Sequence, residues 1–255
     1  MKRDLLYEMI YKRKSFHLFR EKQGEISPEE LNAVYEFFSQ ADLLVSDIRT
    51  DMRIVPANET TCNRGEEYCI LLYSECKENY LQNMGYIGEQ IDLFLATKNI
   101  GALWFGIGKT EEKSYDGLDF VIMIAIAKMP EEKFRKDMFK AKRKFLDEIW
   151  VGDIPAYADI LRFAPSACNT QPWIVEKEGN TLRVYRYKKP GKRGIMPADK
   201  VAFYNRIDIG IFLCFLDICL AHDGQRFERK LFIDDAKDSM EKVLAAEYTL
   251  TETDS

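Results

Sequence analysis

The chain has 255 residues, of which 46 % are apolar and 31 % are charged. This composition supplies enough apolar material for a sizeable core and excludes a disordered or low-complexity chain. The net charge of −5 fits a nucleic-acid binder poorly, so we expect no nucleic-acid partner. The length corresponds to one large domain or two small ones.

The sequence carries no signal of a secretory or membrane segment. Acidic residues interrupt the N-terminus, and the longest apolar runs, residues 120–127 and 209–216, fall well short of the about 20 residues that a membrane-spanning helix needs. The six cysteines form no CxxC pair and the two histidines stand far apart, which favours buried thiols over a metal site. We therefore expect a cytoplasmic protein without membrane contact, disulfide framework or bound metal.

Helix signals come first along the chain. Residues 4–12 place their apolar side chains on one helical face. Ser27, Pro28 and Glu30 predict the start of a second helix, with Ser27 as the N-cap and Glu30 at the capping-box position.

Two buried strands follow in the first half. Residues 66–74 and 119–128 are almost continuously apolar, as in a sheet that is covered on both faces. Between them, residues 87–100 predict a helix that ends at Gly101. The charged residues 131–147 predict a solvated, partly helical connection between two halves of the chain.

The second half repeats this order loosely. Residues 153–163 predict a short helix, residues 173–187 a β-hairpin, residues 199–222 a long buried helix and residues 227–233 a last strand. Helices and strands alternate without a fixed repeat, so we expect an α+β fold with one mixed sheet flanked by helices.

Common phosphate-binding and nucleophile motifs do not explain the chain. Residues 106–110 (Gly-Ile-Gly-Lys-Thr) end like a Walker A loop, but Leu103 stands where that motif needs a glycine. Neither Gly-x-Gly-x-x-Gly nor Gly-x-Ser-x-Gly occurs in the sequence. The basic run at residues 183–193 predicts a solvated hairpin and loop, or a landing patch for a phosphorylated substrate such as NAD(P)H.

The most informative segment is residues 162–173, Arg-Phe-Ala-Pro-Ser-Ala-Cys-Asn-Thr-Gln-Pro-Trp. One interpretation is a helix that ends at Pro165, followed by turns and the start of a strand. The segment also concentrates Ser, Asn, Gln and free backbone amides around two prolines. Such a rigid polar loop is suited to the hydrogen-bonding edge of a flat heteroaromatic ligand.

Residues 164–173 closely resemble the Ala-Pro-Ser-x-x-Asn-x-Gln-Pro-Trp signature of FMN-dependent nitroreductases. Residues 13–19 (Arg-Lys-Ser-Phe-His-Leu-Phe) resemble the phosphate-binding segment of the same family. Residues 96–108 resemble its glycine-rich segment around a tryptophan. The resemblance implies a nitroreductase-like fold and FMN as the cofactor.

The order of these segments departs from the usual pattern. In ordinary members the Ala-Pro-Ser loop comes soon after the phosphate segment, and the flavin lies between two subunits. Here residues 40–50 are degenerate at that place, and the loop stands in the second half of the chain. The chain therefore resembles a subgroup with two nitroreductase-like halves, here residues 1–147 and 148–255. We expect an intrachain pseudo-dimer: a monomer with one flavin site that needs no partner chain.

The resemblance also implies the cofactor contacts. For the FMN phosphate, Arg13, Lys14 and Ser15 supply guanidinium, ammonium and hydroxyl donors, and His17 stands where the family usually has Arg or Lys. The flavin ring needs donors near its pyrimidine edge and N5, and glycines that let the backbone approach it closely. The candidate ring contacts are Gly106, Ile107, Gly108, Pro165, Ser166, Ala167, Asn169 and Gln171.

The implied activity is that of an FMN-dependent NAD(P)H oxidoreductase. NAD(P)H gives a hydride to the flavin and is replaced by a small-molecule electron acceptor, such as a nitro compound or a quinone. The flavin carries this chemistry, so no catalytic side chain is expected. Two alternatives stay open: a non-catalytic flavin-binding or flavin-storage protein on the same fold, and an interaction protein that has lost cofactor binding.

Overall fold

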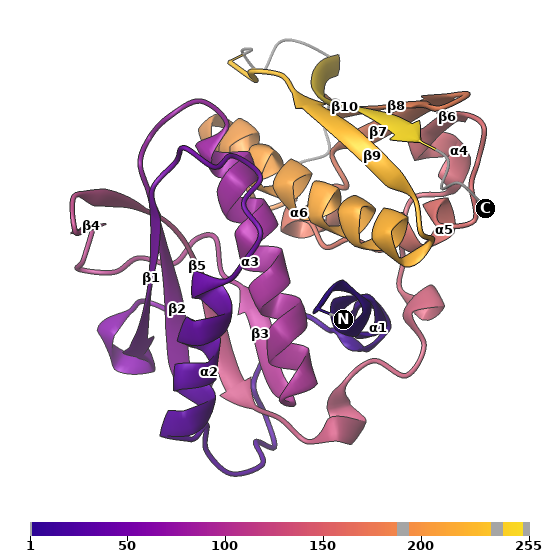
Figure 1. Cartoon of the computed structure of the whole chain (residues 1–255). Helices are drawn as coiled ribbons and strands as arrows, with labels where there is room; N and C mark the ends of the chain where they lie inside the picture. The colour runs from indigo at the N-terminus through magenta and orange to yellow at the C-terminus, as the bar shows by residue number, and fades with distance from the viewer. Residues whose placement is uncertain (1, 188–193, 236–241, 252–255) are drawn as a thin grey trace.

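The computed structural model describes residues 2–187, 194–235 and 242–251. Two long helices, α3 (Tyr80–Thr97) and α6 (Val201–His222), pack against each other at the centre of the molecule (Figure 1). Most residues of both helices are buried. The prediction of a long buried helix over residues 199–222 is confirmed.

The first half of the chain forms a five-stranded antiparallel sheet. Its strands are β1 (Thr50–Pro56), β2 (Tyr68–Ser74), β3 (Ile100–Trp104), β4 (Ser114–Tyr115) and β5 (Leu118–Lys128). They run in the order β1-β2-β5-β3, and the short β4 pairs with β5. The two continuously apolar segments of the sequence are the central strands β2 and β5.

This first sheet is buried on both faces, which explains its apolar strands. On β2, Ile70 and Leu72 belong to the main core around α3. Leu71 and Tyr73 point to the opposite face and pack in a second cluster, which includes Phe16.

The second half forms a separate five-stranded sheet. Its strands are β6 (Trp150–Gly152), β7 (Trp173–Glu178), β8 (Thr181–Tyr187), β9 (Arg226–Leu231) and β10 (Lys242–Thr251), in the order β6-β7-β8-β10-β9. Only β6 and β7 are parallel, so this sheet is mixed. The expectation of one mixed sheet is therefore wrong, because the chain builds two sheets around the helix pair. The strand predicted at residues 227–233 is also not the last, since β10 follows it.

Shorter elements complete the fold. The capping box at the start of α2 is confirmed: Ser27 Oγ accepts a hydrogen bond from Glu30 N (3.2 Å), and the Glu30 carboxylate accepts one from Ser27 N (3.1 Å). The remaining α-helices are α1 (Lys2–Lys12), α2 (Pro28–Ser39), α4 (Leu146–Ile149) and α5 (Ala158–Leu161), and 3-10 turns cover Ala57–Glu59, Glu131–Lys133, Met138–Lys140, Ala167–Asn169 and Ala198–Lys200.

The prediction that a helix ends at Gly101 is wrong. Helix α3 begins at Tyr80 and ends at Thr97, and Gly101 lies inside β3. A Cβ atom at this position would lie 2.8 Å from the Phe16 ring and 2.7 Å from Met129 Cγ. The glycine therefore allows close packing across the strand.

The connection between the halves is solvated only in part. Phe134 and Met138 are buried, and the backbone N–H of Arg135 donates to the carbonyl of Lys12 (3.0 Å) at the end of α1. The connector, residues 131–147, thus runs along the first half before it enters the second.

Glycines bring α3 and α6 into backbone contact. A Cβ atom at Gly85 would lie 2.0 Å from the Ile207 carbonyl oxygen, and one at Gly210 would lie 1.9 Å from the Gln82 carbonyl oxygen. The contact is reciprocal: Gly85 on α3 faces Ile207 on α6, and Gly210 on α6 faces Gln82 on α3. Gly210 stands 125 positions after Gly85, and Ile207 stands 125 positions after Gln82.

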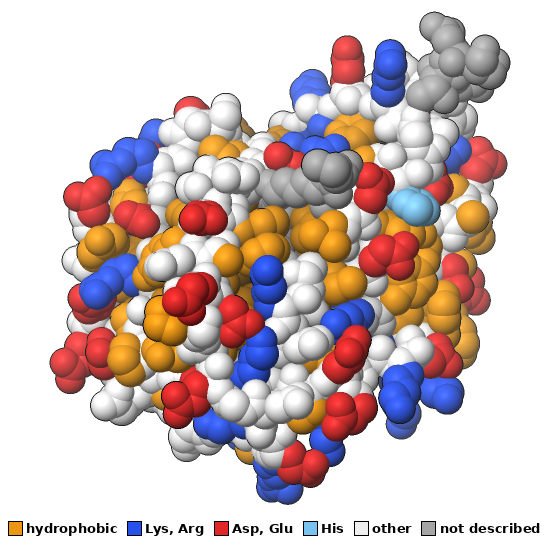
Figure 2. Space-filling model, turned by 60° about the horizontal axis from the view of Figure 1, so that its bottom comes forward, with side chains coloured by type: hydrophobic (Ala, Val, Ile, Leu, Met, Phe, Trp, Pro, Cys, Tyr) orange, Lys and Arg blue, Asp and Glu red, His pale blue; other side chains and the backbone are white. Residues whose placement is uncertain are grey.

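Acidic and basic side chains are interspersed on the face seen in Figure 2, with apolar side chains exposed between them. Across the described ranges 2–187, 194–235 and 242–251, the helices are too short or too polar to cross a lipid bilayer.

Candidate functional site

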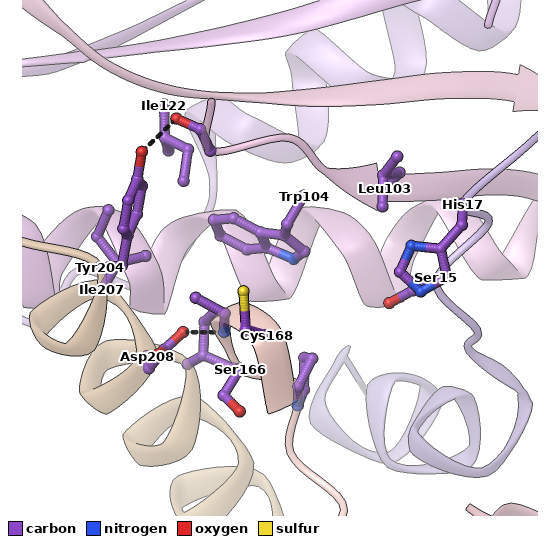
Figure 3. Close-up of a pocket in the computed structure, with 14 residues that line it drawn as sticks. Ser15, His17, Leu103, Trp104, Ile122, Ser166, Cys168, Tyr204, Ile207 and Asp208 are labelled. Atoms are coloured by element: carbon purple, nitrogen blue, oxygen red, sulfur yellow. Dashed lines mark hydrogen bonds between the residues drawn. The ribbon is translucent and has the colours of Figure 1, made fainter. Parts of the chain in front are cut away.

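A cleft of about 590 Å³ lies where the two halves of the chain meet (Figure 3). The first half contributes Ser15 and His17, which follow α1, and Trp104 at the end of β3. The second half contributes residues 165–168 and one face of α6. Segments that are far apart in the sequence therefore line one cavity.

The loop at residues 164–173 has an unusual backbone. Cys168, Asn169 and Gln171 have φ angles of 50°, 55° and 46°, in the left-handed region that non-glycine residues seldom adopt. Ser166 Oγ accepts a hydrogen bond from Gln171 N (2.9 Å), which closes the loop on itself. Such a conformation costs on the order of 1–3 kcal/mol per residue and persists only where the surroundings enforce it.

Asp208 supports this loop from α6 and lines the cleft (Figure 3). Its Oδ1 accepts a hydrogen bond from Ala167 N (2.9 Å), while Oδ2 is buried and has no hydrogen-bond partner among the described residues. Burial raises the pKa of Asp208 to about 8, although the bond from Ala167 opposes the shift. The side chain therefore carries a proton at neutral pH, and this polar group is available to a ligand.

Replacing Asp208 with Asn should make the protein more stable at high pH. The folded state keeps the proton up to about pH 8, whereas the unfolded chain loses it near pH 4, so ionisation lowers the free energy of unfolding as pH rises between these values. An amide does not ionise, so it avoids this loss. Its oxygen can accept the bond from Ala167 N, as the amide oxygen of Asn83 accepts bonds from Leu44 N and Val45 N.

Chemical denaturation at pH 5 and pH 8 measures the difference. We expect Asp208→Asn to gain up to about 4 kcal/mol relative to wild type between these pH values, at about 1.4 kcal/mol per pH unit. Asp223→Asn, at the exposed end of the same helix, should keep the wild-type pH dependence. Parallel pH profiles for wild type and Asp208→Asn would contradict a raised pKa.

Arg13 lies behind the cleft and does not line it. Its guanidinium is 2 % exposed, with Nη2 2.9 Å from Asp92 Oδ2 and Nε 3.7 Å from Glu89 Oε1. Nη2 also donates to Ser15 Oγ (3.2 Å), and Asp92 accepts a bond from Trp104 Nε1 (3.1 Å). Arg13 thus orients two residues of the cleft wall through a buried network.

Three other predicted residues hold the connector and do not line the cleft. Asn169 Oδ1 accepts a hydrogen bond from Arg143 Nη1 (2.7 Å), and Gln171 Oε1 accepts one from Lys144 N (2.9 Å). Lys14 Nζ donates to a connector carbonyl (3.0 Å). These contacts fix the loop at residues 164–173 and the segment after α1 to the same stretch of chain.

The glycine-rich segment divides between cleft and core. Gly106 lines the cleft, and its carbonyl accepts a hydrogen bond from the Tyr204 hydroxyl (2.7 Å), as Figure 3 shows. Ile107 lines an adjoining cavity of about 810 Å³. Gly108 lines neither cavity, and a Cβ atom there would lie 2.4 Å from Met123 Sδ.

The adjoining cavity shares His17, Trp104 and Tyr204 with the first. It adds Arg64 and Met196, so it has a cation at its wall. Together the two cavities form one site, of which the adjoining cavity is the more open part.

The basic run at residues 183–193 is described only up to residue 187. Arg186, within it, is buried and pairs with Asp234 through two hydrogen bonds (2.5 and 2.9 Å), so it is a structural cation. The rest of the predicted landing patch, residues 188–193, lies outside the described residues.

Sequence reasoning missed several cleft residues. Trp104 lies within residues 96–108, which resemble the family's glycine-rich segment, but it was not among the predicted contacts. Tyr204, Asp208 and Ile211 lie on the long buried helix. Their spacing of four and three places them on one helical face, which is the signal that could have grouped them. It could not show that this face meets the loop at residues 164–173.

The chain matches the family model described as "Putative TM nitroreductase" over residues 5–220. Its fold is similar to that of a solved protein from Thermotoga maritima MSB8, described as a putative nitroreductase, with a TM-score of 0.60 and 18 % identity over 96 % of this chain and 92 % of that chain. A second solved structure is described as a putative nitroreductase in complex with FMN, from Desulfovibrio desulfuricans. It has a TM-score of 0.44 and 15 % identity over 59 % of this chain and 98 % of that chain. No curated protein matches the chain.

Proposed function

Because the chain belongs to this nitroreductase family, we propose that it is an FMN-dependent NAD(P)H oxidoreductase whose flavin binds in the cleft between the two halves. The observation that carries the proposal is the meeting of Ser15 and His17 with residues 165–168 in one cavity. These are parts of the two segments that resemble the family's phosphate-binding and ring-binding motifs.

The lining of the cleft fits a flat heteroaromatic ring. Trp104, Ile122 and Ile207 supply apolar walls. Residues 165–168 supply backbone groups, and the unpartnered Oδ2 of Asp208 supplies a polar contact at the same wall. The redox chemistry would come from the flavin, which takes a hydride from NAD(P)H and passes electrons to an acceptor such as a nitro compound or a quinone.

The connector carries two arginines toward the phosphate end of this site. The bond from Arg135 N to the Lys12 carbonyl (3.0 Å) places one beside Arg13. The bond from Arg143 to Asn169 places the other at the loop. Arg143 Nε is buried and has no hydrogen-bond partner in the described part of the chain. The connector therefore supplies an unused donor, Arg143 Nε, between the two family segments.

These arginines lack sufficient counter-charge. Burial, and then the neighbouring Arg13, Arg135 and Arg162, lower the pKa of Arg143 to about 10. Burial and Arg13 lower the pKa of Arg135 to about 10, while Asp92 opposes the shift. A phosphate dianion would relieve this repulsion and accept charge-assisted hydrogen bonds. Arg143 is thus our candidate for the strongest FMN phosphate contact.

Titration with FMN and with riboflavin tests both the cofactor and this contact. Arg143→Ala should weaken FMN binding by about ten- to a hundred-fold, the 1.5–3 kcal/mol of one charge-assisted bond, and should change riboflavin binding little. Lys136→Ala, an exposed cation on the same connector, is the matched control and should leave both affinities unchanged. Flavin fluorescence gives both dissociation constants.

Two outcomes would argue against the proposal. A flat FMN titration of the wild type at tens of micromolar protein would show that the protein does not bind FMN. Equal losses of affinity for FMN and riboflavin in Arg143→Ala would show that Arg143 does not contact the phosphate. If FMN binds, steady-state NAD(P)H oxidation with nitro and quinone acceptors separates an enzyme from a flavin-storage protein.

The same titration should give one flavin per chain, as expected for an intrachain pseudo-dimer. The strand order β1-β2-β5-β3 corresponds to β7-β8-β10-β9, and the helix contact is reciprocal, as in a two-fold interface. The offset of 125 positions that relates the two helices also matches Leu231 to Gly106, which lines the cleft. We therefore take the depression that Leu231 lines as the counterpart of the cleft. Asp47, Glu78 and one cation, Lys77, line it. Lys77 Nζ already pairs with Glu75 (3.0 Å), so the carboxylates would repel a phosphate there. Two flavins per chain would contradict this organisation.

A further inference from the structure

Two thiols and one carboxylate converge on the second face of the first sheet. The ligand atoms of Cys62, Glu66 and Cys69 lie within 4.8 Å of one another, and all three residues are buried. Cys69 belongs to β2, and the other two residues belong to the loop that leads into it. The expectation of no metal site rested on the spacing of cysteines and histidines, whereas the fold adds Glu66 as a third donor.

The loop holds these donors in place. Thr60 Oγ1 accepts a hydrogen bond from Cys62 N (3.1 Å) and lies 3.4 Å from Cys69 Sγ. Glu66 Oε2 accepts one from Arg64 N (2.7 Å). These contacts hold the three ligand atoms close together before any ligand arrives, and Thr60 adds a hydroxyl beside Cys69, so little ordering is needed for binding.

The surroundings of the cluster are apolar. Cys62 and Cys69 pack in the same core cluster as Phe19, Phe105 and Met123. Cysteine binds a metal as the thiolate, so each thiol that becomes a ligand must give up its proton. Binding of a cation would therefore release protons.

We propose that Cys62, Glu66 and Cys69 bind a thiophilic divalent cation such as Zn²⁺, with the Thr60 hydroxyl or a water molecule in the fourth position. Two sulfur donors and one carboxylate suit tetrahedral zinc, whereas Mg²⁺ and Ca²⁺ prefer oxygen donors alone. The bound metal clamps the loop before β2. That loop carries Arg64 to the wall of the adjoining cavity, so the metal fixes a cation beside the cleft.

The test uses full-length protein that has been reduced, stripped with a chelator and freed of flavin. Titration with Co²⁺ should produce a thiolate-to-cobalt charge-transfer absorption that saturates at one equivalent per chain, and Zn²⁺ should displace it with release of protons. Cys62→Ser and Glu66→Gln should each weaken binding at least about 100-fold, more than loss of an outer-shell partner costs. Cys76→Ser, at an exposed cysteine, should bind as wild type does.

Lack of a saturable charge-transfer band in the reduced wild type would overturn the proposal. So would equal losses in Cys76→Ser and Cys62→Ser. Glu66→Gln keeps the size of the side chain, and circular dichroism will show whether each variant folds. Because no flavin is present, the result is independent of the function proposed above.

Discussion

Gly210→Ala should destabilise the protein by at least about 3 kcal/mol, at the upper end of the cost of overpacking. The new Cβ atom would lie 1.9 Å from the Gln82 carbonyl oxygen and 2.8 Å from Tyr86 N, and both atoms belong to the backbone of α3. A backbone cannot move aside as a side chain can, so the two central helices must separate. Such a loss is a large share of a typical stability of about 5–15 kcal/mol.

Thermal or chemical unfolding of two further variants makes this result specific. Gly85→Ala meets the Ile207 carbonyl oxygen at 2.0 Å and should cost about as much as Gly210→Ala. Gly179→Ala, in the turn between β7 and β8, meets no atom within 4 Å and has only a φ of 54° to accommodate, so it should cost about 1–2 kcal/mol. If all three variants lose equal stability, the close helix contact is not the cause.

Arg13→Ala should cost about 3–5 kcal/mol of stability, because it removes the cation from a buried cluster. Asp92 and Glu89 would then lie in the core without the guanidinium that now contacts both. Burial, and then Asp92, already raise the pKa of Glu89 well above its ordinary value, while Arg13 opposes the shift. Without Arg13, the Glu89 carboxyl should keep its proton to higher pH, so the stability of the variant should fall further as pH rises.

Denaturation at two pH values measures this effect, with Arg20→Ala at an exposed arginine as the control. Ligand binding adds a second readout. Since the guanidinium of Arg13 already contacts two carboxylates, we expect FMN and riboflavin to lose affinity alike, in contrast to Arg143→Ala. A selective loss of FMN with unchanged stability would show instead that Arg13 binds the phosphate directly.

Local signals predicted the elements that they directly encode. Ser27 and Glu30 form the expected capping box, and the apolar segments around Ile70 and Ile124 are the central strands of a sheet covered on both faces. The polar residues of α3 concealed its first two turns. Asn83, for example, is fully buried because it caps backbone groups of a distant loop, which no local pattern reveals.

The number of sheets could not be read from local patterns. Strand β10 mixes Ala245 and Ala246 with exposed polar residues, and only its pairing between β8 and β9 makes it a central strand. The sequence predicted that Gly101 ends a helix, because glycine is typical both of a helix end and of a strand position where neighbouring side chains approach the backbone closely. These features depend on tertiary packing.

For the candidate site, the sequence motifs indicated which segments matter but not which way each side chain points. Ser15, Ser166 and Ala167 line the cleft, whereas Asn169 and Gln171 turn toward the connector. That orientation follows from left-handed backbone angles at consecutive non-glycine positions, which propensities do not favour.

The connector has a consequence for how the cleft behaves on dilution. Residues 131–147 join the two walls covalently, and bonds to the segment after α1 and to the loop at residues 164–173 hold it along its course. Two walls on separate molecules would come apart below their dissociation constant, whereas a short tether keeps an effective concentration on the order of millimolar. The cleft of a single chain therefore stays assembled however few copies a cell contains.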